Sequence, residues 1–253
     1  MKTIVLTQAR LNSKRLPLKV LKNINKKHNS LSVLQKRISY CKNIDSHIFI
    51  VPKNDYTLIS YFKEANFIFE VGSENNLMER HLYAAKKYNA ETIIRITSDC
   101  PFADPELIDH AIEQYYSEIN IEKDRYLYIS NHTPPEESDF PNGSDVEIFS
   151  LDCLEYISTK YRSDLDREHV TFPMWDGRES ERIKHIKLRR DSKPNNVSRI
   201  RITLDNPEDL EVLKILADNI DIELSRLEDI ETVYNRLLLY NINSKFKSRE
   251  GWV

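Results

Sequence analysis

The sequence is poor in cysteine and lacks a long apolar run. Its three cysteines, Cys41, Cys100 and Cys153, lie far apart in 253 residues. Their odd number and wide spacing argue against a disulfide framework and a zinc site, and suit reduced thiols. No apolar run approaches the roughly 18 residues of a membrane span, and the first residues lack a signal-peptide pattern. We therefore expect a cytoplasmic protein that does not enter a membrane.

Acidic residues are absent from the start of the chain. The first is Asp45, whereas Arg10, Lys14, Arg15 and Lys19 all precede it. The formal net charge is nevertheless −3, so the acidic surplus lies downstream. This balance argues against a generic nucleic-acid binder, whose basic surplus must neutralise many phosphates. An anionic ligand with a metal ion could bridge the basic start and the acidic remainder.

Glycine is scarce, with four in the chain, but the apolar pattern is regular. Short β-branched runs alternate with amphipathic stretches, which predicts an α/β fold with a mostly parallel sheet. We expect strands at 3–6, 47–51, 67–71, 92–97, 126–130, 145–149, 183–188 and 198–203. Helices are predicted at 31–41, 55–64, 76–88, 207–219 and 226–240, with further helices beginning at Pro105 and near Asp166. Residues 131–142 predict a long loop that could act as a lid.

Charged residues follow three of the predicted strands. A basic loop from Thr7 to Lys19 follows the first strand, Asp99 follows strand 92–97, and Asp205 follows strand 198–203. Open α/β sheets bind ligands at the carboxyl edge of their strands, where these side chains are expected to meet. Arginine chelates phosphate oxygens, and Mg²⁺ accepts two carboxylates together with phosphate oxygens. The pattern favours a metal-bound triphosphate, but a solvated loop and two turn-capping aspartates would give the same pattern.

Two carboxylates and a histidine form a second candidate group. Strand alternation over 145–149 buries Val146 and Ile148 and aligns Asp145 with Glu147 on the other face. Such a pair is either exposed to solvent or part of a site. His169 stands near a predicted helix start, and a lone histidine is more often structural than functional.

Several motifs resemble those of the cytidylyltransferases that make CMP-activated acidic sugars, including the 3-deoxy-manno-octulosonate and acylneuraminate enzymes. The most similar branch is the one named for spore-coat polysaccharide synthesis. The motifs follow the family's order from Met1 to about Ile220: Gln8-Ala9-Arg10, Arg15-Leu16-Pro17 with Lys19, Gly72-Ser73-Glu74 with Arg80, Arg95 to Pro101, Asp104 to Asp109, Asp145 to Phe149, Arg167 to Thr171, and Thr203 to Leu210.

The resemblance implies a Rossmann-like nucleotidyltransferase sandwich with a mostly parallel sheet and a small β-containing extension. It places the nucleotidyltransferase domain at 1–222, with an acceptor and dimerisation extension at about 120–175, and a C-terminal helix and tail at 223–253. It further implies a homodimer.

The resemblance also assigns roles to individual residues. Asp99 and Asp205 would bind Mg²⁺ and, with Arg10, Arg15 and Lys19 on the triphosphate, would form the catalytic set. The nucleotide would also contact Leu6, Gln8, Ala9, Ser73 and Arg80. The acceptor would lie toward Asp145, Glu147 and His169.

The implied reaction transfers a nucleotidyl group from CTP, or another nucleoside triphosphate, to an acidic sugar or a sugar or polyol phosphate, and releases pyrophosphate. Two other classes stay open. A nucleotide-sugar glycosyltransferase commonly carries Asp-x-Asp, but Thr97 stands two residues before Asp99. A non-catalytic nucleotide-binding subunit is favoured by Asn12, Leu18 and Ser98, which stand where the family usually has glycine.

Overall fold

The computed structural model describes residues 1–190, 197–243 and 245–246. Within them, seven strands form one sheet. Their order is β3-β2-β1-β4-β6-β5-β7. The strands are β1 (Thr3–Gln8), β2 (Ser46–Pro52), β3 (Phe69–Gly72), β4 (Thr92–Thr97), β5 (Tyr126–Ser130), β6 (Glu147–Ser150) and β7 (Ile183–Lys187). Only β6 runs antiparallel to its neighbours. The predicted α/β class with a mostly parallel sheet is confirmed.

Helices cover both faces of the sheet, because alternate residues of the central strands point to opposite sides. Val5, Phe49 and Ile94 pack into one apolar cluster, while Ile4, Ile48 and Ile93 pack into the other. The first cluster contains side chains of α1 (Ser30–Ile38), α2 (Tyr56–Glu64), α4 (Pro105–Ile119), α8 (Pro207–Ala217) and α9 (Leu227–Arg236). The second contains side chains of α3 (Leu77–Lys87), α5 (Leu151–Lys160) and α7 (Phe172–Trp175).

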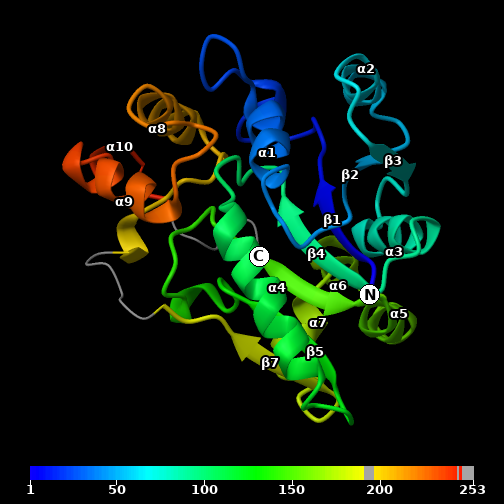
Figure 1. The fold of residues 1–253 in the computed structure, drawn as a ribbon. Coiled ribbons are helices and arrows are strands. Elements are labelled where there is room, and N and C mark those ends of the chain that lie inside the picture. The colour runs from blue at the N-terminus through cyan, green and yellow to red at the C-terminus, as the bar shows by residue number, and fades with distance from the viewer. Residues whose placement is uncertain (191–196, 244, 247–253) are drawn as a thin grey trace.

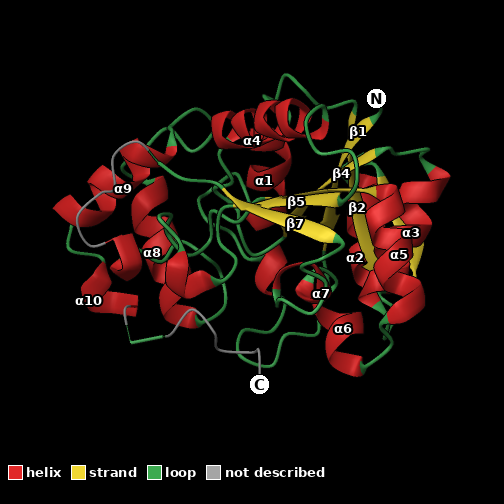
Figure 2. Cartoon of the chain, turned by 90° about the horizontal axis from the view of Figure 1, so that it is seen from below, coloured by secondary structure: helices red, strands yellow, loops and turns green. Residues whose placement is uncertain are grey.

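The remaining helices are α6 (Asp164–His169) and α10 (Tyr240–Asn243). Helices α8, α9 and α10 gather at one end of the molecule, and α3 and α5 lie at the other (Figures 1 and 2). No helix in the described residues is long and apolar enough to cross a membrane.

Helix starts follow the chemistry of their capping residues. The Asp104 side chain accepts from the backbone N–H of Glu106 at 2.9 Å, and Pro105 occupies the first turn of α4, as predicted. The same carboxylate accepts from the backbone N–H of Leu227 at 2.6 Å. One cap therefore fixes the start of α4 and ties α9 to it.

The predicted strand at 198–203, before Asp205, is not formed in the structure. These residues lie beside a loop, not beside a strand with which they could form a sheet. This segment contains the 3₁₀ turn Val197–Arg199 and a single bridge between Asn142 and Arg201. Two backbone hydrogen bonds support that bridge, from Asn142 to Ile200 at 3.2 Å and from Ile202 to Asn142 at 2.8 Å.

The predicted helix 226–240 also needs correction. Helix α9 ends at Arg236, and Leu238 has a positive φ of 52°, which interrupts the helix before α10. Leu237 is therefore 37% exposed, whereas Ile230 and Val233 pack in the core. Helix α5 was not predicted, and the predicted tail 248–253 lies outside the described residues.

Gly143 allows the segment that leads to Asp205 to pack closely against it. Its φ is +100°, and a Cβ there would lie 2.3 Å from the backbone nitrogen of Thr203. The next backbone N–H, that of Leu204, donates to the Asp99 carbonyl oxygen at 2.8 Å. Gly143 therefore permits the close approach that brings Asp205 beside Asp99.

We expect Gly143→Ala to lower the free energy of unfolding by about 3 kcal/mol or more, because it adds a backbone collision to the strain of a positive φ. Gly177→Ala is the matched control, since Gly177 has φ +95° and a Cβ added there would have no atom within 4 Å. The control should lose only about 1 kcal/mol. Urea denaturation measures both, and equal losses would contradict the role given to Gly143.

Candidate active site

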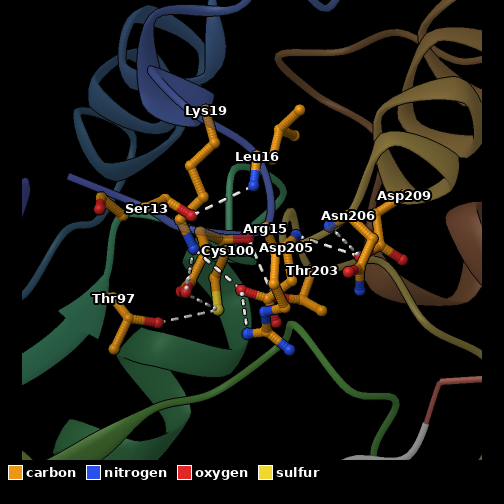
Figure 3. Close-up of polar contacts among 12 residues, drawn as sticks. Ser13, Arg15, Leu16, Lys19, Thr97, Cys100, Thr203, Asp205, Asn206 and Asp209 are labelled. Atoms are coloured by element: carbon orange, nitrogen blue, oxygen red, sulfur yellow. Dashed lines mark hydrogen bonds and ion pairs between the residues drawn. The ribbon is translucent and has the colours of Figure 1, made fainter. Parts of the chain in front are cut away.

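Lys19 lies between two carboxylates at the carboxyl edge of the sheet. Its Nζ is 3.0 Å from Oδ2 of Asp99 and 2.9 Å from Oδ1 of Asp205. Lys19 begins a 3₁₀ turn in the basic loop after β1, Asp99 follows β4, and Asp205 precedes α8. Figure 3 shows Arg15 and Lys19 of the basic loop converging with Asp205. The structure thus brings together four of the residues predicted to form the site, Arg15, Lys19, Asp99 and Asp205.

Lys19 is cationic, Asp99 and Asp205 are anionic, and all three side chains are partly buried. The side chains of Lys19, Asp99 and Asp205 are 12%, 28% and 17% exposed. Burial alone would lower the pKa of Lys19, but the two carboxylates outweigh it and raise that pKa. Burial would raise the pKa of Asp99, but the Lys19 ammonium, the Thr97 hydroxyl and a backbone N–H together outweigh it and lower that pKa to about 2. Lys19 and Asp99 are therefore both ionised at neutral pH.

Asp205 has two further cationic partners. Arg15 lies 3.2 Å from Oδ1 and Arg201 lies 3.1 Å from Oδ2. Arg201 also donates to both oxygens of Asp209, at 2.9 and 3.1 Å. Asp209 in turn accepts from the backbone N–H groups of Asp205 and Asn206, at 3.1 and 2.9 Å. This buried network, which the sequence interpretation missed, fixes Asp205 at the start of α8.

The basic loop makes a turn that usually needs glycine, but Leu18 occupies that position. Leu18 has φ 57° and ψ 24°, the left-handed conformation that glycine favours, and its side chain is 49% exposed. Its backbone N–H donates to the Leu11 carbonyl at 3.4 Å, and the Leu11 N–H donates to Asp55 at 2.9 Å. Leu18 therefore keeps a glycine-like backbone and points its bulk toward solvent.

Arg10 lies apart from Lys19. Its side chain is 64% exposed and lies 3.4 Å from Glu168 at the end of α6. The predicted phosphate-binding cations therefore divide, with Lys19 and Arg15 beside the carboxylates and Arg10 reaching across the edge toward α6.

The residues predicted near the base and ribose line the ends of β1 and β3. Leu6 and Ala9 are buried, and the Gln8 side-chain oxygen accepts from Nε of Arg95 at 3.0 Å. Arg80 donates to the backbone oxygens of Ser73 at 2.9 Å and Glu74 at 3.2 Å. Burial lowers the pKa of Arg80 to about 10. Arg80 thus shapes the turn that carries Ser73, and direct contact with a nucleotide stays a prediction.

The predicted acceptor residues contact different groups. Both oxygens of Glu147 accept from Arg95, at 3.0 and 2.9 Å, and Thr171 donates to one of them at 2.9 Å. Asp145 lies outside β6, and its Oδ2 accepts from the Cys100 thiol at 3.4 Å. Burial lowers the pKa of His169 at the end of α6. Glu147 is therefore committed to a buried ion pair, while Asp145 lies on the side of Asp99.

The family match and the structural neighbours indicate that the chain is a nucleotidyltransferase. The sequence pattern of the family described as "Cytidylyltransferase" matches residues 4–241. The chain belongs to the cytidylyltransferase family, as its motifs predicted.

Relatives and solved structures agree with this assignment. The spore coat polysaccharide biosynthesis protein SpsF of Bacillus subtilis is 27% identical over 220 residues, covering 84% of this chain and 85% of SpsF. A cytidylyltransferase structure from Leptospira borgpetersenii serovar Hardjo-bovis superposes with a TM-score of 0.82 at 26% identity, covering 96% of this chain and 98% of that one. A CMP:2-keto-3-deoxy-manno-octonic acid synthetase complexed with CTP shares the fold, with a TM-score of 0.59 at 12% identity over 87% of this chain and 99% of that one.

We expect Lys19→Met to lower the free energy of unfolding by about 2 kcal/mol at pH 7, because Asp99 loses its cation while Asp205 keeps Arg15 and Arg201. Chemical denaturation of the protein measures this loss. The exposed Lys14→Met in the same loop is the control and should lose less than about 0.5 kcal/mol.

The loss of unfolding free energy in Lys19→Met should be larger at pH 7 than at pH 4. In the wild type, the lowered pKa of Asp99 stabilises the fold above pH ~4, and that stabilisation is lost as pH falls toward 2. Without Lys19, burial raises the pKa of Asp99 instead, so the loss shrinks between pH 7 and pH 4. A loss that grows toward pH 4 would contradict the ion pair.

Proposed function

We propose that the chain is a Mg²⁺-dependent cytidylyltransferase that transfers CMP from CTP to an acidic sugar or a sugar or polyol phosphate and releases pyrophosphate. One observation carries the proposal: Lys19 lies within 3.0 Å of both Asp99 and Asp205 at the ligand-binding edge of the sheet. Membership of the cytidylyltransferase family supports CTP as the donor.

The donor atoms fit a magnesium ion. Two carboxylates converge on one cation, the Lys19 ammonium, which shows that their oxygens can share a positive partner. Mg²⁺ characteristically takes one or two carboxylates and completes its shell with water and phosphate oxygens. The described residues contain no group of three or more His, Cys, Asp or Glu side chains suited to a metal.

Asp99 and Asp205 would hold the ion, which when bound would neutralise and orient the phosphates. Arg10, Arg15 and Lys19 would bind the β- and γ-phosphates. The ends of β1 and β3, with Leu6, Gln8, Ala9, Ser73 and Arg80, would hold the base and ribose. An acceptor oxygen near Asp145, Glu147 and His169 would then attack the α-phosphorus in line. Such positioning contributes up to ~7–11 kcal/mol in ideal cases.

The biological setting is part of the same proposal. The name of the Bacillus subtilis relative supports a role in surface polysaccharide or glycan synthesis. We place the reaction in the cytoplasm and expect a homodimer formed through the extension at about 120–175, within a nucleotidyltransferase domain of residues 1–222.

The two other classes are weaker. The Thr97 hydroxyl contacts the Cys100 thiol at 3.1 Å and supplies no carboxylate for the Asp-x-Asp of a glycosyltransferase. The left-handed backbone of Leu18 weakens the sequence observation that favoured a non-catalytic subunit, because the loop keeps a glycine-like path.

We expect Asp99→Asn and Asp205→Asn each to abolish magnesium-dependent pyrophosphate release and to keep the fold, because each removes a charged oxygen ligand. Wild type and variants are incubated with each nucleoside triphosphate, Mg²⁺ and a panel of keto-acid sugars and sugar or polyol phosphates. Circular dichroism checks the fold, and Asp218→Asn, exposed at the end of α8, is the control. Full turnover by both site variants would refute the metal assignment.

A further inference from the structure

Three polar side chains, those of His132, Asp145 and Cys100, meet near Asp99. His132 follows β5, Asp145 precedes β6, and Cys100 follows β4. Because β6 runs antiparallel to β4 and β5, its first residues lie at the same edge as the ends of those two strands. The topology therefore places all three at the edge that holds the proposed metal ligands.

The buried side chain of Asn131 holds two of these segments together. Its Nδ2 donates to the Ser144 carbonyl at 2.7 Å, and its Oδ1 accepts from the Val146 N–H at 2.8 Å. These bonds flank Asp145 on both sides and involve the residue next to His132. Both backbones are thereby fixed, and the placement of the His132 and Asp145 side chains is built into the fold.

The side chains of His132 and Asp145 leave some of their polar atoms without hydrogen bonds. Both ring nitrogens of His132 and Oδ1 of Asp145 are buried and have no hydrogen-bond partner among the described residues. Nε2 of His132 lies 3.8 Å from Oδ1 of Asp145, which is close enough for ionic attraction and too far for a hydrogen bond. Buried polar atoms without partners are rare in folded proteins, so three in one place require an explanation.

The Asp145 carboxylate is accessible and lacks a permanent cation. Its side chain is 27% exposed, so a ligand at the edge can reach it. Burial, followed by the charges of Asp99 and Glu147, raises its pKa, while His132 and the Cys100 thiol oppose that rise. Burial also raises the pKa of Cys100 well above its usual range, so this neighbour stays a neutral donor.

We propose that Asp145 is the general base that takes the proton of the attacking acceptor hydroxyl, and that His132 is the residue that positions it. This inference rests on the proposed nucleotidyl transfer. The acceptor O–H bond breaks and its proton passes to the Asp145 carboxylate. The same oxygen forms a bond to the α-phosphorus, and the bond from that phosphorus to the bridging oxygen breaks as pyrophosphate leaves.

His132 acts on the buried side of Asp145. Nε2 faces Oδ1, so closing the 3.8 Å separation on acceptor binding would form the missing hydrogen bond. Catalytic hydrogen bonds are commonly long in unliganded enzymes and shorten in the substrate complex. The second carboxylate oxygen then remains directed toward Cys100 and the edge.

The same geometry selects the class of acceptor. A phosphate oxygen is already anionic at neutral pH and needs no base. A hydroxyl group supplies the proton that Asp145 takes. The nucleophile is therefore a sugar hydroxyl, as in a keto-acid sugar, and not the phosphate of a sugar or polyol phosphate.

The test compares Asp145→Asn, His132→Leu and His132→Gln with the wild type, using CTP, Mg²⁺ and, as separate acceptors, 3-deoxy-manno-octulosonate, N-acetylneuraminate and glycerol 3-phosphate. Gln can supply an N–H donor near the position of Nε2, whereas Leu cannot. Asp164→Asn, fully exposed on α6, and His110→Gln, exposed on α4, are matched controls. Pyrophosphate release is followed from pH 5 to 9, together with CTP binding by calorimetry and stability by urea denaturation.

We expect turnover with a keto-acid sugar and none with glycerol 3-phosphate. Asp145→Asn should lower kcat by about 10²–10⁴-fold without loss of CTP affinity or stability. His132→Leu should lower kcat by about tenfold, and His132→Gln should restore most of it. Activity of the wild type falls as pH drops through the pKa of Asp145. His132→Leu should move that fall to higher pH, because His132 lowers this pKa.

The outcomes separate this inference from the proposed function. Wild-type turnover that Asp145→Asn leaves unchanged, or turnover with glycerol 3-phosphate, would overturn the general base and leave the cytidylyltransferase intact. Equal loss in His132→Leu and His132→Gln with an unmoved pH profile would overturn the positioning role. Absence of wild-type turnover with every acceptor would contradict the proposed function and this inference together.

Discussion

The ionic contact of Lys19 with Asp99 and Asp205 is the constraint on which the rest of the structure depends. It joins a loop after the first strand, a loop after the fourth and the start of α8. Charges removed from water are costly unless they are paired, so these segments must stay together or expose the groups again. The contact therefore holds this edge together and keeps its charges where we propose that an anionic substrate and a metal ion bind.

Buried arginines support this edge, and each donates hydrogen bonds to more than one residue of the chain. Arg201 fixes Asp209 and Asp205, and Arg95 joins Gln8 on β1 to Glu147 on β6. Arg37 on α1 donates to the carbonyls of Ala103, Ile222 and Ser225 at 2.8, 3.1 and 2.8 Å. This last set anchors the connection between α8 and α9 to the sheet domain. The predicted boundary at 222/223 thus lies within a bonded connection, and the division itself stays a prediction.

The sequence predicted what local periodicity and strand direction determine. The strands, most helices and the position of Asp99 follow from alternation and from the shared carboxyl edge of parallel strands. Predictions from the sequence failed where one loop pairs with another. Arg201 lies in an extended segment mistaken for a strand, and His132 and Asn131 act through contacts across the edge that no periodic pattern reveals. Glu147 was predicted to lie toward the acceptor, and its ion pair with Arg95 was missed because Arg95 stands on another strand.

We propose that Lys19, Asp99 and Asp205 form the binding site for a metal-bound nucleoside triphosphate. Calorimetric titration of the wild-type protein with CTP, in the presence and absence of Mg²⁺, tests it most directly. We expect one CTP bound per chain, with an affinity that rises when Mg²⁺ is present, because the ion would join the phosphates to the two carboxylates. Equal CTP affinity with and without Mg²⁺, or no binding in either condition, would contradict it.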